Sequence, residues 1–235
     1  MVNSNTYLIP EMPDLPFRLG RHVNHDERNF EPHHLALVAP PKRSLVANPL
    51  WYRRGVFDQG ETSSCVPHAT VGLLRTMPFS TRFSGKLLYD DESEILFLYD
   101  ASQLVDPWPG PPPAYDGTST DATLRVLRAR GEIMTWKWLR GESEVREWLT
   151  WYGPCIVGTT WLANMFWPNS KGYLDCSGAE VGGHEYELVR YDPGRDAYRM
   201  VNSWGAAWGQ SGRAWIRSED MAMLLDRDGD AATIG

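Results

Sequence analysis

The spacing of apolar residues changes near residue 154, and this change constrains the fold more than any other feature. Before it, apolar residues recur at helical spacing in the segments 92–105, 119–131 and 142–152. After it come short segments rich in β-branched and aromatic residues, separated by glycine-rich turns, as is typical of strands. These segments are 155–161, 184–192, 197–204 and 213–218.

Helices therefore dominate residues 60–153 and strands dominate residues 154–220. Such segregation is typical of an α+β fold, in which a helical half packs against a half formed by a sheet or barrel. A cleft between two such halves is a natural place for a functional site. We find no internal repeat.

The first 44 residues differ in composition from the domain that we expect over residues 45–235. They are rich in proline, asparagine, histidine and charge, and we interpret them as an extended, mostly irregular arm on the surface. Histidines in such an arm are expected to be exposed polar residues. Those histidines are His22, His25, His33 and His34.

Composition and charge exclude several classes of function. The formal charge is −7 with acidic and basic residues interspersed, and without a basic stripe we predict no nucleic-acid partner. No run of 18 apolar residues exists, so we predict no membrane partner. The N-terminal sequence lacks the features of a secretory signal, which favours a cytoplasmic or virion-associated protein. The oligomeric state is left open.

Three cysteines, an odd number without a secretory signal, are interpreted as thiols, although a Cys155–Cys176 bridge is an alternative. Cys155 lies in an apolar strand segment and is expected in the core. Cys65 differs, because it stands at the start of a helix expected to run from residue 64 or 65 toward Met77, before Pro78. The unpaired amides of a helix N-terminus favour a thiolate there.

A catalytic thiol needs a base, an orienting group for that base and donors for the developing oxyanion. Gln59 precedes Cys65 by six residues and can supply a donor together with the Cys65 backbone amide. His184 follows two glycines and begins a strand, and Asn202 lies within reach on a neighbouring segment to orient it. His68 lies on the same helix as Cys65, but a base on the opposite wall would leave room for the substrate carbonyl.

Three sequence stretches together carry a family resemblance: "QGETSSC", "GGH" and "NSWGAAWGQSG". In the order Cys, His, Asn, and in the glutamine-to-cysteine spacing, the chain resembles the papain-like cysteine peptidases over residues 45–220. The residues after Cys65 are similar to those of bacterial and phage-encoded members. The resemblance implies a papain-like fold, with a helical subdomain packed against a β-barrel-like antiparallel sheet and an active-site cleft between them.

The resemblance also implies a role for each matching residue and an acyl-transfer reaction on a peptide or protein substrate. A thiolate attacks the peptide carbonyl, and a thioester forms and is hydrolysed. In this scheme Cys65 is the nucleophile, His184 the acid and base, Asn202 its orienting group and Gln59 an oxyanion donor. Gly117, Thr118 and Gly183 line the substrate, Trp204 shields the His184–Asn202 bond, and Trp208 lies near the leaving group.

Two departures from the family pattern keep other functions open. Val66 replaces the usual aromatic residue after the nucleophile, and Glu185 replaces a small apolar residue after the base. A carboxylate there is expected to raise the pKa of His184 or to alter substrate preference. The alternatives are a cell-wall peptide hydrolase or transpeptidase, and a structural or binding component, for example of a phage particle. We predict no metal ion, no cofactor and, for the run 226–230, a solvated tail rather than a calcium loop.

Overall fold

The structure is a computed structural model that describes residues 6–7, 14–24, 50–51, 55–82, 91–108 and 116–235. Two of its described helices begin at a residue whose side chain caps the helix. The Asp91 side chain accepts a hydrogen bond from the Ser93 amide, and Ser119 accepts one from the Ala122 amide. The helices are α2 (Cys65–Leu74), α3 (Phe79–Arg82), α4 (Glu92–Gln103), α5 (Thr120–Ala129), α6 (Gly141–Trp151), α7 (Ser218–Asp228) and the 3-10 turn η2 (Ala163–Phe166).

The strands of the β half form one antiparallel sheet of six strands in the order β3-β8-β4-β5-β6-β7. A separate pair, β1 (Thr6–Tyr7) and β2 (Val23–Asn24), joins two parts of the N-terminal region. The α+β prediction is therefore confirmed. The strands of the sheet are β3 (Trp136–Trp138), β4 (Cys155–Leu162), β5 (Glu180–Asp192), β6 (Ala197–Val201), β7 (Arg213–Arg217) and β8 (Asp230–Ile234).

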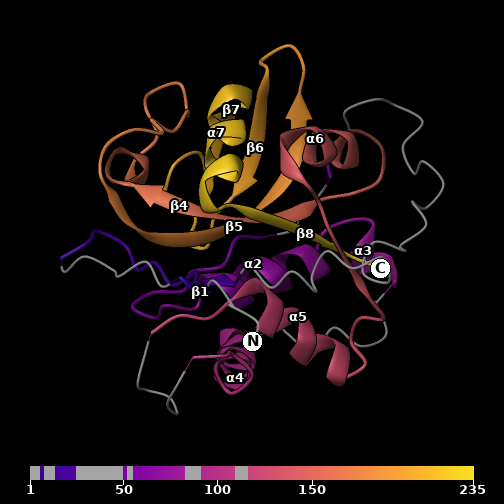
Figure 1. Cartoon of the computed structure of the whole chain (residues 1–235). Helices are drawn as coiled ribbons and strands as arrows, with labels where there is room; N and C mark the ends of the chain where they lie inside the picture. Colours follow the sequence, from indigo (N-terminus) through magenta and orange to yellow (C-terminus); the bar gives the residue numbers. More distant parts are fainter. Residues whose placement is uncertain (1–5, 8–13, 25–49, 52–54, 83–90, 109–115) are drawn as a thin grey trace.

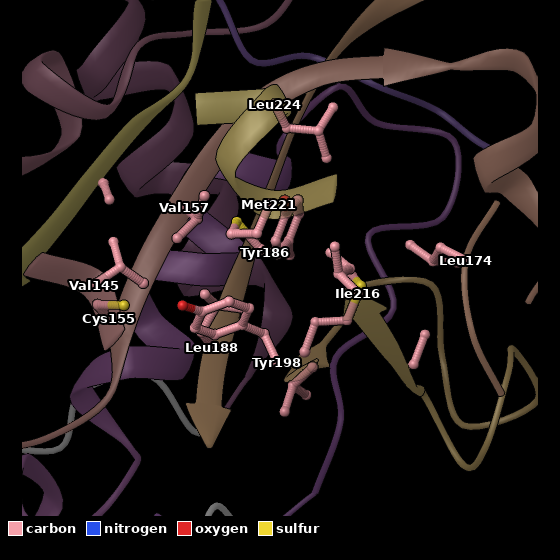
Figure 2. Packing of buried hydrophobic residues seen from close by; sticks show 14 of the residues in the cluster. Val145, Cys155, Val157, Leu174, Tyr186, Leu188, Tyr198, Ile216, Met221 and Leu224 are labelled. Atoms are coloured by element: carbon pink, nitrogen blue, oxygen red, sulfur yellow. The ribbon is translucent and has the colours of Figure 1, made fainter. Parts of the chain in front are cut away.

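The sheet separates two hydrophobic cores, because successive residues of a strand point to opposite faces. Cys155 and Val157 of β4 join the core under α6 and α7, whereas Ile156 joins the core formed with α2, α4 and α5. Figure 1 shows α6 and α7 above strands β4, β5 and β8, and α2, α4 and α5 below them. Figure 2 shows the first core, in which Met221 of α7 packs over the strand residues.

The C-terminal residues are not a solvated tail, so that prediction is wrong. Residues 218–228 form α7, and Asp230 begins β8, which pairs with both β3 and β4 inside the sheet. Ala231, Ala232 and Ile234 are buried there. The run of aspartates concealed this strand, because its pairing partners lie some 70 to 100 residues earlier in the sequence, beyond the reach of local pattern.

The prediction of a surface arm is also wrong for residues 19–23. Leu19, Arg21 and Val23 are buried, and so is His22, whose Nε2 bonds to the Asp116 carbonyl. Burial lowers the pKa of His22 from its usual value. His25, His33 and His34, and the expected boundary after residue 44, lie outside the described residues.

Candidate active site

Cys65 is the first residue of α2, as the sequence predicts, and it is buried. The loop before it is held by short-range hydrogen bonds: the Thr62 amide and hydroxyl both donate to the Gln59 carbonyl, at 3.2 and 2.7 Å. The helix packs against β5, the strand that carries His184. The nucleophile candidate and the base candidate therefore stand on two elements that contact each other.

The Gln59 side chain is fixed by three hydrogen bonds. Its Oε1 accepts from the Ser203 hydroxyl at 2.6 Å, which leaves Nε2 as the donor on the other side. That Nε2 donates to the Thr62 carbonyl at 2.8 Å and to the Arg18 carbonyl at 3.2 Å. Gln59 thus presents an amide donor to a carbonyl oxygen of another chain segment, as an oxyanion donor must.

His184 and Asn202 meet through a buried hydrogen bond of 2.8 Å between Nε2 and Oδ1. Asn202 Oδ1 also accepts from the Ser203 amide at 2.8 Å, which fixes it as the acceptor. His184 Nε2 must therefore carry the proton, and in a neutral ring Nδ1 is left with a lone pair. Nδ1 is buried with no hydrogen-bond partner within the described part of the chain, so it is the atom available to act as a base.

Two tryptophans enclose the His184 ring. Trp204 stacks on it with a centroid distance of 4.5 Å, and Trp161 meets it edge-on at 4.8 Å. Burial lowers the pKa of His184 to about 4, and the hydrogen bond to Asn202 opposes this only in part. Glu185 lies on the opposite face of β5, and burial, not a carboxylate, dominates the pKa of the base.

His68 is occupied within its own helix. Its Nδ1 bonds to the Ser64 hydroxyl at 3.0 Å and to the Ser64 carbonyl at 2.8 Å. Its ring also meets Phe57 edge-on. These contacts make His68 part of the packing at the start of α2, rather than of the opposite wall.

The other two cysteines are placed differently from Cys65. Cys155 is fully buried in β4, as expected, and burial raises the pKa of its thiol. Cys176 is half-buried and its pKa is raised for the same reason. All three cysteines are described, and none of them forms a disulfide, so the alternative Cys155–Cys176 bridge is not formed.

A segment of the N-terminal region, residues 17–22, lies in the cleft between the two halves. The amides of Gly20 and Arg21 both donate to the Gly183 carbonyl, at 3.0 and 2.9 Å. On the other side, the Thr118 amide donates to the Gly20 carbonyl at 2.9 Å. We call residues 17–22 the cleft segment.

Glycines make this close approach feasible. A Cβ atom on Gly117 would lie 2.2 Å from the Gly20 carbonyl oxygen, and one on Gly183 would lie 2.2 Å from that of Arg21. Gly117, Thr118 and Gly183 were all predicted to line a substrate. Here they contact the backbone of the cleft segment.

The cleft segment also reaches the catalytic candidates. The Arg18 carbonyl accepts from Gln59 Nε2 and from Trp204 Nε1, each at 3.2 Å. Phe17 stacks on the same Trp204 ring at 4.5 Å. Trp208 packs edge-on against Trp204, and its Nε1 donates to the Phe166 carbonyl at 2.7 Å. This hydrogen bond fixes the Trp208 ring, which in turn helps to hold the Trp204 ring in place.

Sequence reasoning missed two features of this site. Trp161 packs on His184, but a single tryptophan in a strand segment gives no local signal of this. Ser203, which bonds to both Gln59 and Asn202, lies inside the recognised "NSW" stretch, and the motif itself could have indicated it. Within the described residues, no group of three or more His, Cys, Asp or Glu side chains could hold a metal ion, and no helix is long and apolar enough to cross a membrane.

Comparison with solved structures identifies the fold. The chain is similar to xylellain, a cysteine protease from Xylella fastidiosa, at 18% identity and a TM-score of 0.57, covering 98% of this chain and 96% of that one. It is also similar to digestive procathepsin L 3 of Tenebrio molitor larval midgut (18% identity, TM-score 0.58, 84% and 72% covered) and to proCathepsin B S9 from Trypanosoma congolense (14%, 0.54, 92% and 91%). The chain has the papain-like cysteine protease fold.

No protein-family model and no curated protein sequence matches the chain. At such low identity the papain-like fold is shared without a detectable sequence relationship. The resemblance carried by the three short stretches is therefore concentrated at the residues of the candidate site.

Proposed function

We propose that this papain-like protein is a cysteine-type endopeptidase that uses Cys65, His184 and Asn202. The observation that carries the proposal is the state of His184. Its Nε2 donates a hydrogen bond to Asn202, and its Nδ1 is buried with no hydrogen-bond partner among the described residues. The strand that carries it packs against the helix that begins at Cys65. A buried imidazole with one nitrogen available, on a strand that contacts the helix of the cysteine, supports a role for His184 in activating the thiol.

In the proposed reaction His184 Nδ1 takes the proton of Cys65, and the thiolate attacks the carbonyl carbon of a peptide bond. The oxyanion that forms accepts hydrogen bonds from Gln59 Nε2 and the Cys65 backbone amide. When the C–N bond breaks, the imidazolium gives its proton to the leaving amine. A water molecule, deprotonated by His184, then hydrolyses the thioester and regenerates the thiol.

The cleft segment supports this assignment of Gln59. The Arg18 carbonyl oxygen, on the two side-chain donors Gln59 and Trp204, stands in for the carbonyl oxygen of a substrate. The segment must leave before a peptide can enter.

Thiol labelling and peptide hydrolysis test the proposal together. Iodoacetamide should modify Cys65 much faster than Cys155 or Cys176, as followed by peptide mass spectrometry. Cys65→Ala should abolish hydrolysis of a casein-derived peptide mixture, whereas the matched control Cys176→Ala should retain it. Equal labelling of all three thiols, or hydrolysis by Cys65→Ala at the wild-type rate, would contradict the proposal.

The filled cleft favours a second candidate, a papain-like fold used as a binding or structural component. In that case the cleft segment would be a permanent part of the core. The two candidates differ in one result: if a variant that displaces the segment still hydrolyses neither peptides nor peptidoglycan, the second candidate is preferred. Activity on peptidoglycan alone would instead support the cell-wall alternative.

A further inference from the structure

Two carboxylates flank a glycine on one face of the sheet. The strand register pairs Gly158 of β4 with Glu185 of β5 on one side and with Asp230 of β8 on the other. Residues paired in this way point to the same face. Because Gly158 has no side chain, the row Glu185–Gly158–Asp230 forms a hollow with an acid at each end, which we call the acidic pocket.

The Arg21 side chain of the cleft segment fills the acidic pocket. Its Nη2 lies 3.0 Å from Asp230 Oδ2 and donates to the Asp228 carbonyl at 2.7 Å. A Cβ atom on Gly158 would lie 2.5 Å from Arg21 Nε, so any other residue at this position would exclude the guanidinium. Only 1% of Arg21 is exposed, which is rare for an arginine and requires compensating charge.

Glu185 adds hydrogen-bonding capacity that the pocket has not used. It is fully buried, and its Oε2 accepts from the Thr120 hydroxyl at 2.5 Å. Its Oε1 has no hydrogen-bond partner among the described residues, and neither do Nε and Nη1 of Arg21. The ion pair of Arg21 is with Asp230, whereas burial, together with the nearby charge of Asp230, raises the pKa of Glu185. Glu185 therefore contributes polar hydrogen-bonding atoms, and a planar guanidinium, with donors on all three nitrogens, can use more of them than a single ammonium.

The acidic pocket is connected to the candidate active site through the backbone. Arg21 donates its amide to the carbonyl of Gly183, the residue directly before His184. A polypeptide that follows the cleft past the base therefore places one side chain in this pocket. Of the side chains on the cleft segment, Arg21 is the one that is fully buried and forms an ion pair, with the partly buried Asp230.

We propose that the acidic pocket is a specificity pocket that selects peptide substrates with an arginine side chain, and that Arg21 occupies it in place of the substrate. This rests on the proposed peptidase function. Glu185, Gly158 and Asp230 are then specificity-determining residues, and the substrate class is arginine-containing peptides. Glu185, noted in the sequence only as a departure from a family pattern, acquires a role in binding.

The test is a matched set of fluorogenic peptides assayed with the full-length protein. Each peptide carries arginine, its neutral isostere citrulline, lysine or norleucine at one position on the acyl side of the scissile bond. At one position we expect kcat/KM for arginine to exceed that for citrulline by about 10- to 100-fold, as charge-assisted hydrogen bonds in a buried site imply. All the peptides compete with the same cleft segment, so the ratio does not depend on how often the segment leaves.

Variants locate the preference. Asp230→Asn should bring the arginine-to-citrulline ratio close to one, whereas the control Asp226→Asn, an exposed aspartate on α7, should leave it unchanged. Glu185→Gln is the second variant in case Asp230→Asn does not fold, and it should also lower the ratio. Equal rates for arginine and citrulline at every position, with hydrolysis intact, would overturn this proposal alone; failure to hydrolyse any peptide or to label Cys65 would overturn the peptidase function as well.

Discussion

Gly20→Ala should uncover the active site of the intact protein. A Cβ atom on Gly20 would lie 2.0 Å from the backbone carbonyl oxygen of Ser63, next to the start of α2. The Gly20 backbone cannot shift by an ångström without losing its hydrogen bonds to Gly183 and Thr118. The cleft segment must therefore leave its place, while every residue of the candidate site stays unchanged.

The size of the effect follows from the contacts that are lost. Displacement at Gly20 breaks its amide bond to the Gly183 carbonyl and the bond from the Thr118 amide to its own carbonyl. Each hydrogen bond contributes a net value of about 1 kcal/mol, so the state in which the cleft segment covers the site is destabilised by about 2 kcal/mol. The fraction of molecules in which the segment has left the cleft then rises about 30-fold. The apparent kcat/KM rises with the competent fraction by the same factor.

The assay compares wild type, Gly20→Ala and a control glycine variant, with mass spectrometry confirming that each chain is uncleaved. Gly194→Ala is the matched control, because Gly194 is exposed and its added Cβ would make only an ordinary contact with Asp192. We expect faster peptide hydrolysis and faster iodoacetamide labelling of Cys65 for Gly20→Ala only. If its labelling rate equals that of wild type, the cleft segment does not limit access and the reasoning is refuted.

Three further predictions test the site and its surroundings. Asn202→Ala should lower kcat by about 10- to 100-fold, part of the contribution of a positioned acid–base group, with a smaller change in KM in steady-state assays. Burial lowers the pKa of His184 to about 4 in the folded protein, against about 6.5 in the unfolded chain. The neutral ring therefore contributes fully to stability above pH 6.5, and this contribution is lost as the pH falls toward 4. Over this range the free energy of unfolding in urea should fall by up to about 3 kcal/mol in the wild type, and His184→Gln should lack this loss. Cys155→Ser should destabilise the protein by about 1–3 kcal/mol in the same unfolding assay, because it buries a hydroxyl in the core, and should leave Cys65 labelling unchanged.

Local sequence patterns predicted much of the helical half correctly. Helical spacing placed α4 and α5 within a few residues of their observed ends, and the change of spacing near residue 154 marked the start of the strands. The short stretches around Gln59, His184 and Asn202 also lie together in space. These successes share one cause, since the information lies within a few residues of each element.

The failures concern contacts between distant parts of the chain. Nothing near Asp230 indicates that residues 230–234 insert between β3 and β4, and nothing near Leu19 indicates that residues 19–23 are buried. A proline-rich, charged composition is typical of a surface arm. Here the segment is buried because Gly117 and Gly183 leave room for its backbone and Asp230 forms an ion pair with its arginine. Composition describes what a segment prefers alone and not what the rest of the fold offers it.

Glu185 shows how register converts a sequence anomaly into a structural argument. From sequence it stood next to His184, where a carboxylate was expected either to raise the pKa of the base or to alter substrate preference. The strand alternation turns its side chain to the other face, and the pairing of β4 with both β5 and β8 sets it across Gly158 from Asp230. A fully buried and a partly buried carboxyl group at such a position are costly to ionise without a cation. Arg21 supplies that cation while the cleft segment is in place. When the segment leaves, the carboxyl groups lose their counter-charge, and the arginine of a substrate restores it.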